Sequence, residues 1–341
     1  ATTVEEGTLA IGGGGGIAAS SGLTLFGTAV FDISGATGTV AIKTLEGGTG
    51  TVVQLGSNTL IVDAAASAIF GGIIKGSGGV TKAGSGTQTF HAVNEYTGQT
   101  RIEGGTLALV GAGDIASSSG VDLAVAGARF DLTSAAGNRT IGGLDGVTGT
   151  TVVLDGKTLT VDTTRSTTFG GTLDGLASAG LVKQGTGTLT LTGGSHTYGG
   201  ATQILSGTLA LSGAGSVAQS SAVRLDGTGT FDISASTSDQ TIRDLSGGID
   251  GRIVLGNRTL AAGTSNDTTF SGIISGDGGF TKQGTGRLIF EGASVYTGTT
   301  TITAGTLALA GGGSLSDSNG VSVASGATFD VSGVTSATAI R

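Results

Sequence analysis

The clearest structural signal in this sequence is the run Thr188-Leu189-Thr190-Leu191-Thr192, which follows the turn-forming stretch Gly185-Thr186-Gly187. Strict alternation of polar and apolar residues is typical of a β-strand with one buried face. Similar short runs, such as Thr306-Leu307-Ala308-Leu309 and Gln88-Thr89-Phe90, are separated by glycine and asparagine every few residues. No window carries a sustained helical stripe, and each interior glycine would cost a helix about 1 kcal/mol. The sequence therefore predicts an all-β fold.

The alternating runs belong to an internal repeat with a period of about one hundred residues, which two markers define. Gly-Thr-Leu-Ala followed by an aliphatic residue occurs at Gly7–Ile11, Gly105–Leu109, Gly207–Leu211 and Gly305–Leu309. Phe-Asp-aliphatic-Ser/Thr occurs at Phe31–Ser34, Phe130–Thr133, Phe231–Ser234 and Phe329–Ser332. The markers divide the chain into repeats 1–103, 104–205 and 206–303, and a partial repeat 304–341. Because Ile340-Arg341 matches Ile242-Arg243, we expect the chain to be part of a longer protein.

The composition excludes several classes of protein. The 341 residues include 69 Gly and no Pro, Cys, Met or Trp, so disulfide frameworks, thiol catalysis and cysteine-bound metals are excluded. A net charge of −8, without a Lys/Arg cluster, argues against nucleic acid as a partner. No apolar run approaches the ~20 residues of a membrane-spanning helix. With 37% hydrophobic residues, the chain can still bury a core.

The absence of linkers between repeats favours one continuous solenoid over separate domains. Solenoid coils stack on their neighbours and share a core, so no boundary between repeats is needed. A parallel β-helix uses roughly 20–25 residues per coil, which gives four or five coils per repeat. The missing proline fits this fold, because each coil donates backbone N–H groups to its neighbours. We therefore predict a right-handed parallel β-helix over residues 1–341, in the form of an elongated rod.

One stretch of each repeat resembles a known motif. Its second copy runs from Gly180-Leu181-Val182-Lys183 through Gly185 and Gly187 to Leu191, and continues with Tyr198-Gly199-Gly200 and Gly207-Thr208-Leu209. The other copies begin at Gly79-Val80-Thr81-Lys82 and Gly279-Phe280-Thr281-Lys282. This pattern resembles the passenger-associated transport repeat of Gram-negative autotransporters. The first copy departs most, with Ala83, Ser85 and Gln88 at positions where the others carry Gln, Thr and Leu.

The resemblance implies a β-helical passenger at the bacterial cell surface, anchored through the outer membrane. Export would use a C-terminal outer-membrane β-barrel of the same polypeptide, which these 341 residues do not include. In that family such repeats are associated with efficient secretion. Coils that fold outside the cell would keep the chain from sliding back. The implied partners are a host-cell or matrix ligand, or like passenger chains.

Recurring polar residues are candidates for sites, and each also has a structural interpretation. Tyr96, Tyr198 and Tyr296 occupy the same position in each repeat and could stack on sugars, but we expect packed rings whose hydroxyl groups find a hydrogen-bond partner.

Lys82, Lys183 and Lys282 also recur and could form a row of sites, an anion ladder, for an anionic ligand. We expect instead that their stems cover the core while each ammonium meets water. Asp32, Asp131, Asp232 and Asp330 alternate with core residues, so we expect them to point outward, several coils apart.

Metal and catalytic motifs are weak. His91 and His196 occupy non-equivalent positions without ligand spacing, and we expect both to be solvated turn residues. Gly111–Asp114 and Gly276–Gly279 resemble calcium-binding glycine-rich repeats, but each stands alone rather than in tandem. We therefore assign no catalytic, cofactor-binding or metal-binding residue, and we expect no cofactor.

The sequence thus predicts a non-enzymatic, extracellular β-helical stalk segment, part of an adhesin or a self-associating surface protein. Two alternatives stay open. A glycan- or surface-binding array would present flat columns of outward threonines, which Thr299–Thr303 permits. A polysaccharide-processing β-helix enzyme would need a singular charged cluster that breaks the repeat on one face, and none is evident in the sequence. Because a stalk projects another binding region, we expect the fragment alone not to bind a ligand.

Overall fold

The computed structural model describes residues 1–194 and 196–335, so the matching pair Ile340-Arg341 lies outside the described residues. It consists of parallel strands without a helix, and forms a β-solenoid of about 16 turns. This confirms the all-β, parallel β-solenoid prediction. The chain divides into two compact units. The first comprises Ala1–Asp162 with Phe169–Gly175, and the second comprises Thr163–Thr168 with the described part of Leu176–Arg341.

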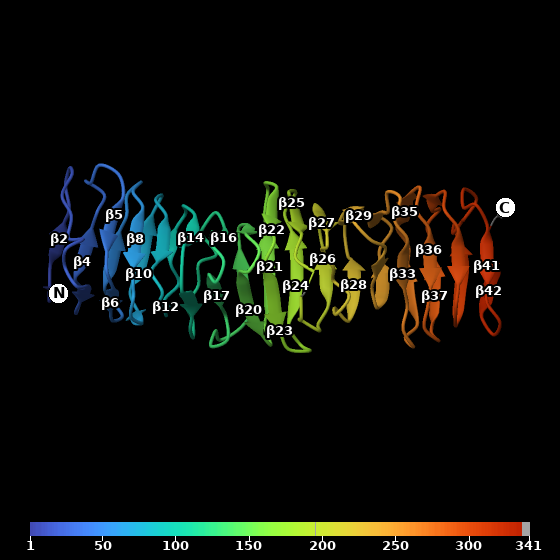
Figure 1. The fold of residues 1–341 in the computed structure, drawn as a ribbon, viewed down its shortest axis with the longest axis horizontal. Helices are drawn as coiled ribbons and strands as arrows, with labels where there is room; N and C mark the ends of the chain where they lie inside the picture. Colours follow the sequence, from blue (N-terminus) through green and yellow to red (C-terminus); the bar gives the residue numbers. More distant parts are fainter. Residues whose placement is uncertain (195, 336–341) are drawn as a thin grey trace. The chain divides into compact units, whose positions relative to one another are not determined.

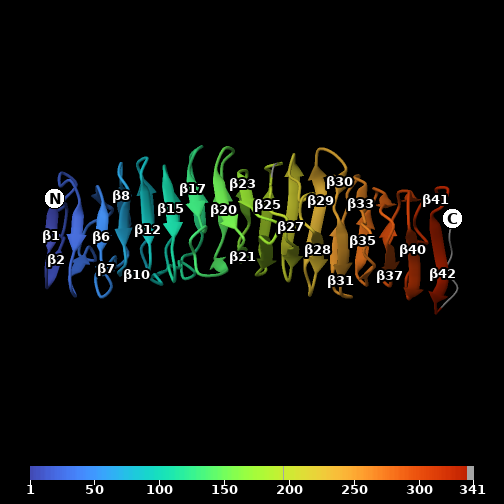
Figure 2. The ribbon, with the colours of Figure 1, turned by 90° about the horizontal axis from the view of Figure 1, so that it is seen from below.

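In the first unit, successive coils place their strands side by side in three parallel sheets, as the labels in Figures 1 and 2 allow the reader to follow. The first sheet contains β1 (Thr2–Val4), β3 (Leu23–Leu25), β6 (Leu45–Gly47), β9 (Ala68–Phe70), β12 (Thr87–Phe90), β15 (Thr106–Leu109), β17 (Arg129–Asp131), β20 (Thr151–Asp155) and β23 (Thr172–Gly175). The second contains β2 (Thr8–Ala10), β4 (Val30–Asp32), β7 (Val52–Gln54), β10 (Ile73–Gly76) and β13 (Glu95–Tyr96). The third contains β5 (Val40–Ile42), β8 (Leu60–Asp63), β11 (Val80–Ala83), β14 (Thr100–Ile102), β16 (Val121–Leu123) and β19 (Leu144–Gly146). In addition, β18 (Arg139–Ile141) pairs with β21 (Thr158–Asp162).

The second unit repeats this arrangement. One sheet contains β24 (Gly180–Gln184), β26 (Thr202–Ile204), β28 (Ala222–Leu225), β31 (Asp244–Gly247), β34 (Thr268–Phe270), β37 (Arg287–Phe290), β40 (Thr306–Gly311) and β42 (Thr328–Val334). Another contains β25 (Thr188–Leu191), β27 (Thr208–Gly213), β29 (Thr230–Ser236), β32 (Arg252–Val254), β35 (Ile273–Gly276) and β38 (Val295–Tyr296). The last contains β30 (Gln240–Thr241), β33 (Leu260–Ala262), β36 (Phe280–Lys282), β39 (Thr300–Ile302) and β41 (Val321–Val323). The strand β22 (Thr167–Phe169) has residues in both units.

The register fixes the length of a coil. Aligned neighbours lie between 19 residues apart, as Thr87 and Thr106 do, and 23 apart, as Gly47 and Phe70 do. This matches the coil length expected from the sequence. The unit boundaries do not coincide with those of the hundred-residue repeats, and the continuity of one column over all 341 residues stays a prediction.

The core consists of aliphatic and phenylalanine side chains that stack on their counterparts in adjacent coils. Leu107 and Leu109 are at most 1% exposed, as are their counterparts Leu209, Leu211, Leu307 and Leu309. Strands such as β15 and β27 alternate buried and outward residues because successive side chains point to opposite faces. The stacking also demands small residues at close approaches between coils. A Cβ atom on Gly78 would lie 1.8 Å from the carbonyl oxygen of Asn58 on the neighbouring coil.

Candidate functional site

A buried chain of hydroxyl groups lies in each repeat. In the first copy, the Tyr96 hydroxyl lies 2.6 Å from Thr100 Oγ1, which lies 2.9 Å from Ser118 Oγ. Ser118 then donates to the carbonyl oxygen of Gly98 at 2.8 Å. Thr100 begins β14, whereas Ser118 precedes the paired strand β16 on the next coil. The hydroxyl chain therefore links consecutive coils.

The other two copies have the same geometry. Tyr198, Thr202, Ser220 and Gly200 are joined by contacts of 2.7, 3.0 and 2.8 Å. Tyr296, Thr300, Ser318 and Gly298 are joined by contacts of 2.6, 3.0 and 2.9 Å. Three hydroxyl groups in series leave no donor unsatisfied if each donates to the next and the serine donates to the carbonyl. In a low-dielectric interior, the hydrogen bonds of such a chain polarise and strengthen one another.

The three tyrosines are at most 1% exposed, and this burial raises the pKa of each phenol well above its usual value, against the lowering effect of the threonine hydrogen bond. The prediction of packed rings with partnered hydroxyl groups is confirmed. The alternative of sugar-stacking platforms is wrong, because the ring faces are inaccessible.

The recurring lysines are buried, so the prediction that each ammonium meets water is wrong. Lys82 is 1% exposed, and its Nζ donates to the carbonyl oxygens of Ala83, Gly84 and Gly104 at 2.6, 2.9 and 3.1 Å. The physical reason lies in the register. Lys82 aligns with Val62 and Ile102, so it occupies a core column. The anion ladder is wrong for the same reason.

The other two lysines make equivalent contacts. Lys183 donates to Gln184, Gly185 and Ser206 at 2.7, 2.8 and 3.3 Å, and Lys282 donates to Gln283, Gly284 and Ala304 at 2.7, 2.8 and 3.2 Å. Each ammonium thus ties its own turn to the next coil. Burial lowers the pKa of Lys82 to about 8, and Asp63 raises it by a smaller amount. Burial also lowers the pKa of Lys282, opposed by Asp267.

The residue two places before each tyrosine is also buried, but its identity varies between repeats. Asn94 accepts from the backbone N–H of Ile74 and donates to the carbonyl oxygens of Ala92 and Asp114, at 3.0 to 3.2 Å. His196 and Ser294 occupy the equivalent positions, at 4% and 2% exposure. Burial lowers the pKa of His196 to about 4.

The two histidines therefore differ. His91 is exposed, as expected of a turn residue, whereas the expectation of a solvated His196 is wrong. Within residues 1–194 and 196–335, no group of three His, Asp or Glu side chains is arranged to hold a metal ion.

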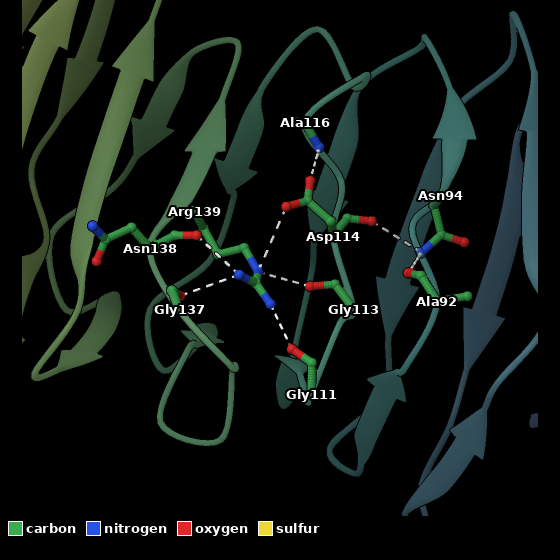
Figure 3. A network of polar contacts seen from close by, with 9 residues as sticks. All are labelled: Ala92, Asn94, Gly111, Gly113, Asp114, Ala116, Gly137, Asn138 and Arg139. Atoms are coloured by element: carbon green, nitrogen blue, oxygen red, sulfur yellow. Dashed lines mark hydrogen bonds and ion pairs between the residues drawn. The ribbon is translucent and has the colours of Figure 1, made fainter.

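An arginine cluster breaks the repeat in the first unit (Figure 3). Arg139 is 8% exposed and donates to four carbonyl oxygens at 2.6 to 3.1 Å. Those acceptors are Gly111, Gly113, Gly137 and Asn138. Asp114 Oδ2 lies 3.6 Å from the Arg139 Nε, and Asp114 Oδ1 accepts from the backbone N–H of Ala116.

This cluster explains the calcium-like segment Gly111–Asp114. Its carbonyl oxygens do bind a cation, but that cation is the Arg139 guanidinium. Arg139 was not predicted from the sequence, although a signal was present, since the other complete repeats carry Val40 and Gln240 at this position. In the second segment, Gly276–Gly279, Asp277 accepts a hydrogen bond from the Thr297 hydroxyl at 3.3 Å.

The recurring aspartates point away from the core, as predicted. Asp32 lies between the buried residues Phe31 and Ile33, and its Oδ1 accepts from the backbone N–H of Ser34 at 2.8 Å. The same turn occurs at Asp131, Asp232 and Asp330. These carboxylates cap turns, which is a structural role.

Comparison with known proteins gives a family and a relative. The passenger-associated-transport-repeat family matches residues 80–109, 181–211 and 280–309. These ranges contain the three buried lysines and tyrosines. The chain is also 32% identical over 271 residues to the adhesin BmaC autotransporter of Brucella suis biovar 1 (strain 1330). That alignment covers 74% of this chain and 8% of the relative.

The comparisons confirm the resemblance derived from the sequence, to an autotransporter passenger with passenger-associated transport repeats. No solved structure matches the chain. Across the described residues, no helix is long and apolar enough to cross a membrane.

Proposed function

We propose that this autotransporter passenger segment is a non-enzymatic β-helical stalk of a surface adhesin, whose transport repeats support secretion by folding in register outside the cell. The adhesin assignment is supported by the relative from Brucella suis, which is named an adhesin. The proposed partner of the whole protein is a host-cell or matrix ligand, with like passenger chains as the second possibility. Anchoring through an outer-membrane β-barrel of the same polypeptide is part of this proposal.

One observation carries the proposed role in secretion. The hydroxyl chain and the lysine contacts recur in all three matched ranges with nearly the same distances. Both features are completed only by the next coil, through Ser118 and Gly104 in the first copy.

These contacts can make coil addition selective for register. A shift by one residue would move the lysine and the threonine to the outer face and leave the polar groups of the next coil unpaired. Burying an unpaired polar group costs about 1–3 kcal/mol. Each correctly stacked coil therefore lowers the free energy of the exported segment, and this opposes its return through the membrane.

The test uses the full-length parent protein in its cell. The triple variant Thr100→Val, Thr202→Val, Thr300→Val interrupts the hydroxyl chain in every repeat. The control is Thr89→Val, Thr190→Val, Thr301→Val, which changes outward threonines of the same repeats. We expect the surface-displayed fraction, measured by protease accessibility on intact cells, to fall about threefold or more for the first variant only, since it carries several unpaired buried hydroxyl groups. Equal display of the two variants would refute the secretion role.

A further inference from the structure

Two arginines border one open depression on the second unit. Arg224 lies in β28 and Arg243 immediately precedes the paired strand β31. The depression is also lined by Ser221, Asp244, Thr264 and Asn266. It lies outside the matched ranges of the transport repeats.

The one carboxylate in this depression is already occupied by neutral donors. Asp244 Oδ1 accepts from the Thr264 hydroxyl at 2.5 Å, and Asp244 Oδ2 accepts from the Asn266 amide at 2.6 Å. Among the described residues, neither the Arg224 nor the Arg243 guanidinium has a hydrogen bond or an ion pair, and both side chains are exposed. Two guanidinium groups without a partner among the described residues thus face solvent in one depression, in a chain with a net charge of −8.

The pair also breaks the repeat. At the position of Arg224 the other repeats carry Thr24, Asp122 and Ser322. At the position of Arg243 they carry Lys43, Gly142 and Arg341. The third repeat alone carries a cation at both positions, so a repeated structural role does not account for the pair.

We propose that this depression binds an acidic saccharide, with the sugar carboxylate held by Arg224 and Arg243. Guanidinium groups bind carboxylates through two parallel hydrogen bonds, which gives geometric specificity. The hydroxyl group of Ser221 lines the same depression and is placed to contact a sugar hydroxyl. A single carboxylate per sugar suits an acidic protein, because a densely charged polyanion would be repelled by the rest of the surface.

This inference rests on the proposed adhesin function and names a ligand class for it. It departs from the expectation that the fragment alone binds nothing. That expectation followed from the interpretation of the segment as a stalk that projects another binding region. The structure supplies a charged cluster by stacking adjacent coils.

The carboxylate could come from a sialylated glycan or from a uronic-acid chain, so the probes are sialyllactose and a glucuronic-acid-containing tetrasaccharide. Neutral lactose and a sulfated hexasaccharide are the comparison probes. We expect one acidic probe to bind the 341-residue chain with a Kd of about 1 mM, as is reasonable for a shallow site, and lactose not to bind. Stronger binding of the sulfated probe than of both carboxylated probes would overturn the ligand class.

The double variant Arg224→Ser, Arg243→Gly introduces residues that other repeats carry at these positions, so the fold should tolerate it. The control, Lys75→Ser with Arg252→Thr, removes two exposed cations elsewhere. We expect about tenfold weaker binding for the first double variant, consistent with the loss of about 1.4 kcal/mol or more. The control should change binding less than twofold. No binding of either acidic probe, or an equal loss in both variants, would overturn the inference. Surface display of the parent with Arg224→Ser, Arg243→Gly should stay normal, so a failure here is distinguishable from a failure of the proposed function.

Discussion

The hydroxyl chains and the Arg139 cluster both satisfy buried polar groups between coils, but by different means. The chain of Tyr96, Thr100 and Ser118 recurs three times with distances that differ by 0.1 Å. The Arg139 cluster occurs once and uses a charged side chain to occupy four carbonyl oxygens.

The difference separates two kinds of interior position. Where the backbone path is the same in each repeat, the same polar contacts are kept, as with the hydroxyl chain and the buried lysines. Where a turn varies in length or sequence, the interior accepts Val40, Arg139 or Gln240 according to the carbonyls that the turn leaves inside. A charged solution is vulnerable, because removing one partner of a buried pair leaves the other uncompensated.

The largest effect is expected at Arg139. Arg139→Ala leaves four carbonyl oxygens without their donor and the Asp114 carboxylate without its cationic partner, and should cost about 3–5 kcal/mol in the free energy of unfolding. Arg139→Gln should cost less, because Gln240 serves the equivalent position in the third repeat. Urea denaturation, with hydrogen exchange at Gly111–Asp114, measures both.

Arg129→Ala provides the control for charge, since Arg129 makes a partly exposed ion pair with Asp131 at 3.2 Å. Exposed pairs contribute at most about 1 kcal/mol. Similar losses for Arg129→Ala and Arg139→Ala would show that the buried contacts do not stabilise the coil.

The next effect concerns His196, the variable buried residue beside Tyr198. Because its pKa in the folded state is about 4, the unfolded chain binds more protons between that pH and its ordinary value near 6.5. The contribution of His196 to the free energy of unfolding is therefore fully present above pH ~6.5. It is lost as the pH drops towards 4, by up to roughly 3 kcal/mol.

His196→Asn, which installs the residue of the first repeat, should remove most of this acid dependence in urea titrations. His91→Asn, at an exposed position, should leave it intact. An unchanged pH profile in His196→Asn would contradict the burial of this side chain.

Interrupting one hydroxyl chain should have a moderate effect. Thr100→Val leaves the Tyr96 and Ser118 hydroxyl groups without a shared partner and should cost about 2 kcal/mol. Thr100→Ser keeps the hydroxyl and should cost less. Thr202→Val and Thr300→Val should match Thr100→Val closely, and a large difference among the three would break the equivalence of the copies.

The buried tyrosines should cause no pH dependence of stability near neutral pH, because they stay protonated in both the folded and the unfolded chain. Their raised pKa in the folded state means that only the unfolded chain releases these protons just above pH ~10. Stability is therefore full below that pH and is lost as the pH rises. The near-ultraviolet tyrosinate absorbance should appear together with unfolding. Because the chain has three tyrosines and no tryptophan, tyrosinate signal from a still-folded chain would disprove the burial of at least one ring.

The sequence predicted much of the fold because its alternation of period two and its hundred-residue period are local patterns. The strands at Thr188–Leu191 and Thr306–Gly311 and the buried leucines were predictable in this way. The burial of Lys82 was not predicted, because its charge was expected to bring the ammonium to water even though the alternation along the strand indicates a buried position. Its position two residues after Val80 had placed it on the core face.

By itself, the sequence determined the strands, the repeat and the faces on which the tyrosines and aspartates lie, since these follow from spacing along one strand. Only the tertiary structure decided which polar groups lie together, as with the hydrogen bond of Arg139 to Gly111 and the depression that Arg224 and Arg243 both line. Such residues come from different coils, and their placement depends on the stacking register and on the carbonyl oxygens that each turn directs inward. These are properties of two coils together, which no single stretch of sequence contains.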